Sequence, residues 1–352
     1  MEYRPLGRSG LRVSTLSFGT MTFGGKGFFE RIGEGGVADA KRQFDMLIEA
    51  GVNLVDTADV YSEGESEKII GEAIKGKRDR LLLASKVRLS MGTGPNDQGL
   101  SRFHIKRACE ASLKRLGTDH IDLYWAHEWD GATPLEETLR AFDDLQQEGK
   151  ISYFGISNWS GWHIMKALGI SERDGLLRPV AQQIHYTLQS REAEYELMPI
   201  AIDQEVSIFV WSPLAAGLLS GKFTRDNPNP KGTRREQGYP EPAGIDQEAL
   251  WKIVDELIAI AGDRGATPAQ IALAWLLTRP GVTSLVIGAR TDEQLADNLK
   301  AAEITLTMEE VTRLETVSRP RLLYPYWHQK ASAAERLSPA DRALLDQFPN
   351  PY

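Results

Sequence analysis

The sequence contains a single cysteine, Cys109, among its 352 residues, so no disulfide bond can form within the chain. A lone thiol suits a reducing compartment, and its place in the helical pattern RACEASL favours a buried packing residue. The first ten residues hold no apolar run of the kind that secretory signals need. No stretch approaches the roughly 18 uncharged apolar residues of a membrane span. We therefore expect a cytoplasmic protein without membrane contact.

Acidic residues outnumber basic ones. The chain has 41 lysine and arginine residues against 49 aspartate and glutamate residues, a net charge of −8. This balance argues against nucleic acid as a partner, because phosphate binding needs a basic face. The six histidines show no metal-ligand spacing, so we expect no metal site. No GxGxxG motif follows a strand pattern, which argues against a Rossmann cofactor site.

Short apolar runs recur along the chain, and amphipathic segments separate them. Most of the runs are continuous rather than alternating, as expected for parallel strands that are covered on both faces. They predict eight strands, over residues 15–20, 51–58, 80–86, 121–127, 151–158, 180–184, 206–212 and 283–289.

The segments between these runs have helical patterns. Residues 39–51 and 101–117 are amphipathic, and each ends on a glycine that suits a helix C-terminus. Residues 133–136 (TPLE) and 267–270 (TPAQ) share one signal. In each, threonine would cap the helix, proline would take the first position, and glutamate or glutamine would complete a capping box.

Strands that alternate with helices predict an α/β fold, and eight such units favour a closed (β/α)₈ TIM barrel. Residues 3–13 predict a β-hairpin before the first barrel strand. We expect a single domain over residues 1–352, with residues 319–352 as a C-terminal tail. Residues 221–246 are rich in glycine, proline and charge, and they predict a long flap.

Polar side chains follow several of the predicted strands. In such barrels the chemistry lies at the carboxyl ends of the strands, where Asp56, Lys86 and His127 stand, with Tyr61 shortly after Asp56. A nearby ammonium group makes a phenol more acidic, and a carboxylate holds the ammonium charged. A histidine at the same rim could bind a substrate oxygen. Together the four side chains could protonate a carbonyl oxygen as hydride reaches the carbon.

Each of these residues alone also has an ordinary structural explanation. A strand-end aspartate often caps a turn, a lysine there usually reaches solvent, a tyrosine mostly packs, and a histidine is more often structural. Their occurrence together at successive strand ends favours a catalytic interpretation.

The chain resembles the aldo-keto reductase superfamily over roughly residues 1–318. It is most similar to the branch that includes bacterial general reductases and potassium-channel β subunits. The resemblance lies in the segments GVNLVDTADVYSEGESEKIIGEAI, LLLASK, SLKRLGTDHIDLYWAHEWD, GKISYFGISNW, QIHYTLQSREAE, SPLAAGLLSGK and IGARTDEQLADNL.

This resemblance implies roles for the four rim residues. Tyr61 would be the general acid, Lys86 would tune it, and Asp56 would support Lys86. His127 would orient the substrate carbonyl. For a carbonyl reductase we also expect substrate contacts from Phe23, Tyr61, His127 and Trp129, with the aromatic residues near Tyr326 and Trp327 as further pocket walls.

The resemblance also implies an NADP(H) site along the same rim. Trp211 would stack on the nicotinamide ring. The planar guanidinium of Arg290 suits a 2′-phosphate, which favours NADPH over NADH. The implied cofactor contacts are Gly19, Thr20, Asp56, Ser157, Asn158, Gln183, Trp211, Ser212, Pro213, Leu214, Gly217, Lys222, Gly288, Arg290, Thr291, Gln294 and Asn298.

Three functions are consistent with these residues. The first is an NADPH-dependent reductase of aldehydes or ketones, with a small-molecule substrate. The second is a cofactor-binding regulatory subunit, as the channel β subunits illustrate. The third is a sugar or polyol dehydrogenase or epimerase, in which the same residues work in the oxidative direction. The loop over residues 23–36 and the tail would shape the choice of substrate.

Overall fold

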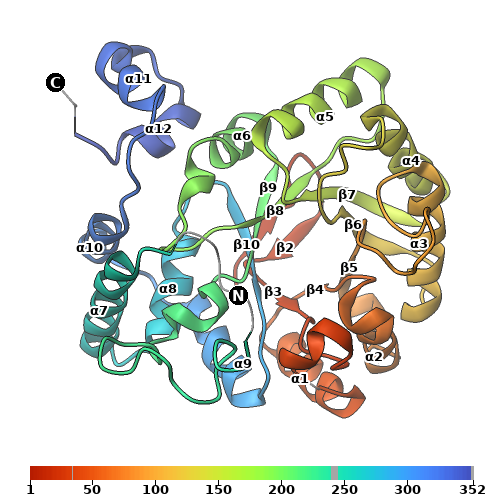
Figure 1. Ribbon diagram of the computed structural model, residues 1–352, viewed down its shortest axis with the longest axis horizontal. Helices are drawn as coiled ribbons and strands as arrows, with labels where there is room; N and C mark the ends of the chain where they lie inside the picture. Colours follow the sequence, from red (N-terminus) through yellow and green to blue (C-terminus); the bar gives the residue numbers. More distant parts are fainter. Residues whose placement is uncertain (34, 239–244, 350–352) are drawn as a thin grey trace.

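The computed structural model describes residues 1–33, 35–238 and 245–349. Eight parallel strands form a closed barrel in the order β10-β3-β4-β5-β6-β7-β8-β9, which confirms the predicted (β/α)₈ fold. Figure 1 shows the helices arranged around the strands. The barrel strands are β3 (Leu16–Gly19), β4 (Leu54–Asp56), β5 (Leu82–Val87), β6 (Ile121–Ala126), β7 (Ile151–Ser157), β8 (Ala181–His185), β9 (Ser207–Trp211) and β10 (Val282–Ile287).

The predicted N-terminal hairpin is also confirmed. Strands β1 (Tyr3–Pro5) and β2 (Arg12–Ser14) pair antiparallel. Leu6, between them, is fully buried and joins the apolar cluster inside the barrel. The backbone N–H of Gly7 donates to the hydroxyl of Ser207, the first residue of β9, at 2.7 Å. The hairpin therefore closes the end of the barrel where the strands begin, and the opposite end is left for the polar residues.

The helices pack on the outside of the barrel and bury its outer face. The helix predicted over residues 39–51 is α1, and the one predicted over residues 101–117 is α3. The main helices are α1 (Val37–Glu49), α2 (Glu65–Ala73), α3 (Arg102–Leu116), α4 (Leu135–Gln147), α5 (Gly161–Asp174), α6 (Leu197–Gln204), α7 (Gln247–Arg264), α8 (Pro268–Leu277), α9 (Asp292–Leu299) and α10 (Met308–Ser318).

One of the two predicted capping boxes forms. At the start of α8, the Thr267 hydroxyl accepts from the N–H of Gln270, and the Gln270 side chain accepts from the N–H of Thr267. The box predicted at Thr133 is wrong, because α4 begins one residue later and Pro134 is its N-cap. The Thr133 hydroxyl instead donates to the carboxylate of Asp130 at 2.7 Å, since a charged acceptor competes well for it.

Cys109 lies in α3 and is fully buried, as its sequence context predicts. Burial raises the pKa of its thiol to about 12, so the group stays protonated and unreactive at neutral pH. Among the described residues, no helix is both long and apolar enough to cross a bilayer.

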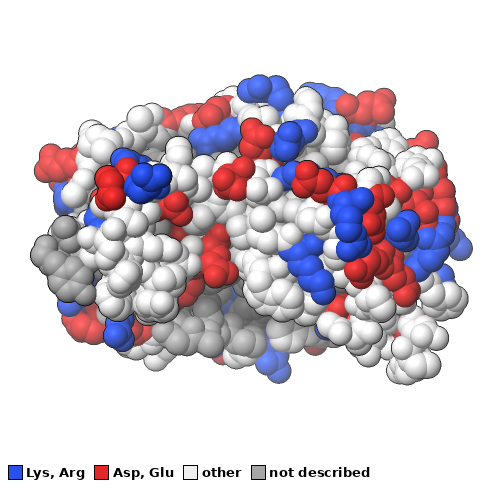
Figure 2. Space-filling model, turned by 90° about the horizontal axis from the view of Figure 1, so that it is seen from above, with Lys and Arg blue, Asp and Glu red and all other residues white. Residues whose placement is uncertain are grey.

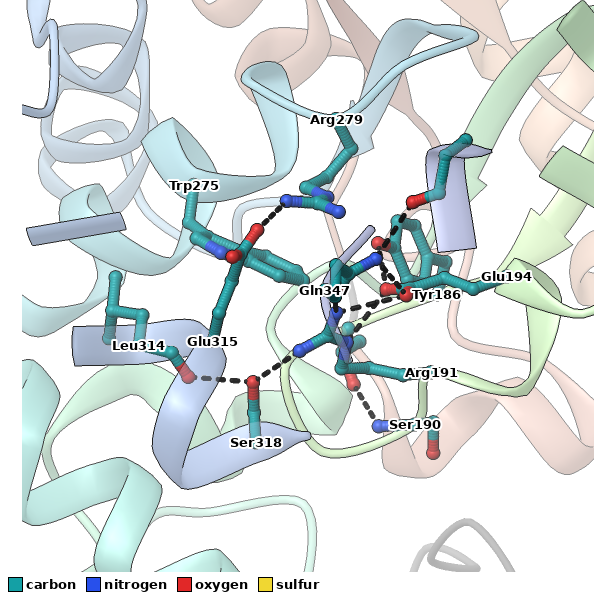
Figure 3. A network of polar contacts seen from close by, with 12 residues as sticks. Tyr186, Ser190, Arg191, Glu194, Trp275, Arg279, Leu314, Glu315, Ser318 and Gln347 are labelled. Atoms are coloured by element: carbon teal, nitrogen blue, oxygen red, sulfur yellow. Dashed lines mark hydrogen bonds and ion pairs between the residues drawn. The ribbon is translucent and has the colours of Figure 1, made fainter. Parts of the chain in front are cut away.

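The C-terminal tail folds into α11 (Tyr326–Ser332) and α12 (Pro339–Leu345), and α12 packs against α6. Figure 3 shows how its end is held. Gln347 accepts from Arg191 and donates to Glu194 at 3.0 Å. Arg191 and Glu194 are themselves a buried ion pair at 2.7 Å, so the tail contributes to a buried polar network.

The long segment predicted to form a flap, residues 221–246, is described in part. Its described residues, 221–238 and 245–246, contain turns and no helix or strand. Residues 239–244 lie outside the described residues, so the prediction of a flap over the whole segment stays a prediction.

Candidate active site

Three neighbouring strands bring Asp56, Lys86 and His127 together. Asp56 ends β4, Lys86 stands near the end of β5, and His127 follows β6. Lys86 and Asp56 form an ion pair, and their side chains are 0% and 2% exposed. Lys86 also donates to the carbonyl of Thr57 at 2.7 Å. Burial opposes the charge on Lys86, but Asp56 and Tyr61 outweigh it and raise the pKa of the ammonium. Lys86 is therefore a fixed cation.

Tyr61 stands next to that cation. It opens the short 3₁₀ helix η2 (Tyr61–Gly64), and its hydroxyl lies 3.3 Å from the Lys86 nitrogen. The next two residues, Ser62 and Glu63, have φ angles of 49° and 57°, which are unfavourable for residues with a side chain. The Ser62 hydroxyl donates to the carbonyl of Phe23 at 2.9 Å and supports this turn. The backbone is therefore strained at the turn that places Tyr61 beside Lys86.

His127 faces Tyr61 across the same site, with the two ring centroids 6.0 Å apart. Burial, followed by the charges of Lys86 and Arg88, lowers the pKa of His127 well below its usual range. The imidazole is therefore neutral at pH 7, and one of its two nitrogens can act as a hydrogen-bond donor.

A single cavity of about 680 Å³ extends from this group across the ends of the strands. Lys86 is not among the described residues that line the cavity, but it contacts Asp56 and Tyr61, which do line it. The residues that line the cavity include these site residues and implied cofactor contacts: Gly19, Asp56, Tyr61, His127, Ser157, Asn158, Gln183, Trp211, Ser212, Pro213, Leu214, Gly217, Lys222, Gly288, Arg290, Gln294 and Asn298.

Two implied cofactor contacts are not among the described residues that line the cavity. Thr20 is fully buried, and its hydroxyl donates to the carbonyl of Asp56 at 3.2 Å. Thr291 caps α9, where its hydroxyl accepts from the N–H of Gln294 at 3.2 Å. Each supports a neighbour that does line the cavity.

Amide side chains in the middle of the cavity form hydrogen bonds to Asp56, His127 and Trp211. Gln183 donates to Asp56 at 2.9 Å. Asn158 donates to the carbonyl of His127 at 3.1 Å and accepts from the indole N–H of Trp211 at 2.9 Å. These bonds hold the Trp211 ring at the end of β9, where a flat group could stack on it.

The turn after β9 suits an anionic group. Ser212, Ala215, Ala216 and Gly217 have φ angles of 49°, 49°, 56° and 101°. Turns that mix left- and right-handed residues point backbone N–H groups into a common concavity, which binds phosphate oxygens. Lys222 lines the cavity just beyond this turn and adds a positive charge. The residues present therefore fit the pyrophosphate of a dinucleotide.

Basic side chains gather at the far end of the cavity. Arg290, which follows β10, donates to the carbonyl of Gly232 at 2.8 Å. Gly232, Thr233 and Arg234 line the cavity beside it. The sequence pattern placed these three residues in the predicted flap over residues 221–246 and did not predict that they line the cavity. The signal that could have found them is the basic run KGTRR over residues 231–235.

Two of the expected substrate contacts, Phe23 and Trp129, do not line the cavity. Phe23 is 1% exposed and packs between Phe18 and Phe44 in the core. Trp129 stacks on His163, with ring centroids 3.8 Å apart, and is not among the described cavity-lining residues.

The tail aromatics do not line the cavity either. Tyr326 packs on Tyr195, with ring centroids 5.1 Å apart, and neither Tyr326 nor Trp327 is among the described residues that line the cavity. Phe28 and Phe29 of the 3₁₀ helix η1 (Gly27–Arg31) line it instead.

Comparison with known proteins agrees with this geometry. A family model described as the aldo/keto reductase family matches residues 15–319. The uncharacterized oxidoreductase YrpG of Bacillus subtilis is 39% identical over 331 residues, covering 90% of this chain and 96% of its own. A probable voltage-gated potassium channel subunit beta of Oryza sativa is 36% identical over 337 residues, covering 93% of this chain and 100% of its own. A putative subunit of the same kind from Schizosaccharomyces pombe is 38% identical over 329 residues, covering 90% and 93%. The chain therefore belongs to the aldo/keto reductase family.

Proposed function

We propose that this protein is an NADP(H)-dependent oxidoreductase that reduces the carbonyl groups of small aldehydes or ketones in the cytoplasm. The observation that carries the proposal is the hydroxyl of Tyr61, 3.3 Å from the buried ammonium of Lys86 at the wall of the cavity. A phenol beside a fixed cation is a stronger acid than a phenol in water. Such a group can protonate an oxygen that becomes negative during reduction.

A nicotinamide held in the cavity would supply the hydride in this chemistry. Tyr61 donates its proton to the carbonyl oxygen, and Lys86 stabilises the phenolate that is left. Asp56 keeps Lys86 charged and in place through their ion pair. The neutral His127 is positioned to donate a hydrogen bond to the same oxygen and so fixes the substrate beside Tyr61. In the reverse direction the phenolate accepts the proton of an alcohol.

The remaining lining residues would hold the dinucleotide. Ser157, Asn158 and Gln183 suit the carboxamide, and Trp211 suits the face of the nicotinamide ring. The positive-φ turn after β9 suits the pyrophosphate. At the far end, the guanidinium of Arg290 suits a 2′-phosphate.

The assignment of the acid is tested with Tyr61→Phe. We expect carbonyl reduction to fall by at least about a thousandfold, because the proton donor is gone. Binding of NADPH, followed by quenching of tryptophan fluorescence, should stay within about threefold of the original protein, since the ring still fills its place. Carbonyl turnover at the original rate would rule out Tyr61 as the acid.

The preference for NADP(H) is tested with Arg290→Met. Loss of a charged hydrogen-bonding group should weaken NADPH binding by about 10- to 100-fold, while NADH binding should change little. Titration of both dinucleotides into the same protein measures this difference. Equal weakening of both would show that Arg290 does not read a 2′-phosphate.

A second candidate is a cofactor-binding regulatory subunit. The names of the rice and fission yeast relatives, which describe potassium channel β subunits, favour it. The two candidates differ in turnover. NADPH oxidation with a panel of aldehydes and sugars would support the enzyme, whereas tight NADPH binding without turnover, together with a co-purified channel, would support the subunit.

A further inference from the structure

Arg88 is a cation near the site that has no part in the proposed proton transfer. It follows β5 directly, two residues after Lys86. Its φ angle is 144°, which is unfavourable for a residue with a side chain. Such strain persists only where surrounding contacts fix the residue, and it clusters at sites that bind ligands. The strained backbone of Arg88 therefore points to a binding role.

Three hydrogen bonds hold this part of the chain in place. The backbone N–H of Gly99 donates to the Arg88 carbonyl at 2.8 Å, and the backbone N–H of His127 donates to the carbonyl of Val87 at 2.9 Å. The Nε of Arg88 donates to the carbonyl of Trp129 at 3.2 Å. The side chain of Arg88 thus reaches from the end of β5 to the loop after β6, the neighbouring strand that leads to His127.

The guanidinium keeps donors for a further partner. The bond to Trp129 uses only its Nε, and Arg88 is partly exposed. In the part of the chain that the structure describes, Arg88 forms no ion pair, and no hydrogen-bond partner contacts its two terminal nitrogens. The N–H groups of those nitrogens match the two oxygens of a carboxylate, to which a guanidinium donates two parallel bonds.

Two acidic residues of the loop after β6 lie near Arg88 but have other donors. Asp130 accepts from the backbone N–H of Leu100 at 2.7 Å, and Glu128 accepts from the backbone N–H of Trp129 at 3.0 Å. The charge of Arg88 acts on both carboxyl groups, yet neither forms an ion pair with it. These two acids therefore leave the terminal nitrogens of Arg88 open to a ligand.

Arg88 stands beside the end of the cavity where Tyr61 and His127 lie. Arg88 itself is not among the described lining residues, but the adjacent Leu89 and the nearby His127 are. Burial, and then the charges of Lys86 and Arg88, lower the pKa of His127, so the guanidinium is close enough to act on that ring. A substrate whose carbonyl lies beside Tyr61 and His127 can extend past Leu89 toward Arg88.

The other cations of the cavity already have partners or lie elsewhere. Lys86 is paired with Asp56. Lys222 and Arg290 follow β9 and β10 and line the cavity where the dinucleotide is proposed to lie. In the closed order of strands, β9 stands opposite β5 and β10 stands opposite β6. An acid group near His127 is therefore within reach of Arg88 and far across the barrel from those two cations.

We propose that Arg88 binds a carboxylate of the substrate, so that the site favours aldehydes that carry an acid group. The guanidinium takes the two oxygens of that group while the carbonyl lies beside Tyr61 and His127. Arg88 is then a specificity-determining residue rather than a catalytic one. The inference rests on the proposed carbonyl reduction and names the class of substrate for it.

Matched acids and esters test the carboxylate site. The probes are 3-carboxybenzaldehyde and 4-carboxybenzaldehyde, each compared with its methyl ester. Acid and ester share a ring and an electron-withdrawing group, but only the acid is an anion at pH 7, and the two isomers direct it differently. With NADPH and the full-length protein, kcat/KM for at least one acid should exceed that for its ester by at least about tenfold, mainly through KM.

Variants of Arg88 test which residue reads the charge. Arg88→Met should raise KM for the preferred acid by about 10- to 100-fold, while kcat/KM for its ester should change by less than about threefold. Arg88→Lys keeps the charge without the planar fork and should restore part of the preference.

Arg12→Met is the matched control for these variants. Arg12 also donates to a backbone carbonyl, that of Tyr3, but it lies on β2, in the hairpin at the opposite end of the barrel. This variant should leave the kinetic constants for acid and ester unchanged.

The outcomes separate the inference from the function on which it rests. Equal or better use of both esters by the original protein would overturn the carboxylate site alone, even if Arg88→Met failed to fold. An equal loss for acid and ester in an Arg88→Met protein that binds NADPH normally would also overturn it, because the role of Arg88 would then be structural. No turnover of any aldehyde by an original protein that binds NADPH would overturn the proposed reduction, and the substrate class with it.

Discussion

Two buried aspartates near the site differ in whether a positive charge contacts them. Lys86 and Asp56 neutralise each other in a buried ion pair. Asp59, on the same loop, is also fully buried, yet neither of its carboxyl oxygens has a hydrogen-bond partner among the described residues. Burial, and then the buried carboxylate of Glu67, raise the pKa of Asp59 well above its usual range. Asp59 therefore keeps its proton to a higher pH in the folded protein than an exposed aspartate does.

The protonation of Asp59 makes stability depend on pH. Above the ordinary pKa of an aspartate, about 4, the unfolded chain releases a proton that the folded chain retains. The free energy of unfolding therefore falls as pH rises, by at most about 1.4 kcal/mol per pH unit, until the folded group also titrates. Asp59→Asn cannot titrate and should lose this fall. Its stability relative to the original protein should increase between pH 4.5 and pH 7.5, measured by urea unfolding.

Asp79→Asn provides the comparison for this experiment, because Asp79 is an exposed aspartate of the same protein. A difference between Asp59→Asn and the original protein that stays constant with pH, as expected for Asp79→Asn, would show that Asp59 is ionised in the folded state.

At the scale of elements, two helices can pack closely where one of them has a glycine at the contact. Helices α2 and α3 approach each other at Gly71, where an added Cβ would lie 2.6 Å from the Leu116 carbonyl oxygen. Gly169, within α5, has no atom within 4 Å of the same position. Both glycines stand inside helices, so helix propensity alone would favour alanine at each. Only Gly71 is required by the packing.

The two glycines give a matched pair of substitutions. Gly169→Ala should stabilise the protein by about 0.5–1 kcal/mol, since alanine has the higher helix propensity. Gly71→Ala should destabilise it by about 1–3 kcal/mol, because α2 must move away from the backbone of α3. Urea unfolding measures both changes, and equal effects would refute the close approach of the two helices.

At the scale of the whole molecule, charge is mixed and the tail is part of the packed structure. Figure 2 shows acidic and basic side chains side by side on the face in view, without a broad basic area. The tail beyond α10 is held by Gln347 in the network of Arg191 and Glu194 (Figure 3). None of the described tail residues lines the cavity. The tail should therefore act on stability more than on the reaction.

This role of the tail is tested with Gln347→Ala. Removal of the amide leaves buried charged groups with fewer partners, which should lower the free energy of unfolding by about 1–3 kcal/mol. The rate of carbonyl reduction at saturating substrate should not change. Gln247→Ala, at the exposed first position of α7, should alter stability by less than about 0.5 kcal/mol. A loss of turnover with Gln347→Ala at full stability would assign the tail to the active site instead.

The sequence by itself determined the parts of this protein that depend on local pattern. Continuous apolar runs predicted all eight barrel strands. A parallel strand that is covered on both faces is apolar along its whole length, so the sequence alone shows it. Strand ends then predicted that Asp56, Tyr61, Lys86 and His127 would meet, since parallel strands end at one rim. The structure brings these four side chains together.

Only the tertiary structure decided which side chains of the loops face the cavity. Phe23 and Phe28 lie five residues apart in one loop, yet Phe23 enters the core and Phe28 lines the site. The Thr133 hydroxyl donates to the carboxylate of Asp130 instead of capping α4, and residues 232–234 line the cavity together with Arg290. Loops lack a repeating period, so the direction of each side chain depends on contacts between segments far apart in the chain, which no local pattern records.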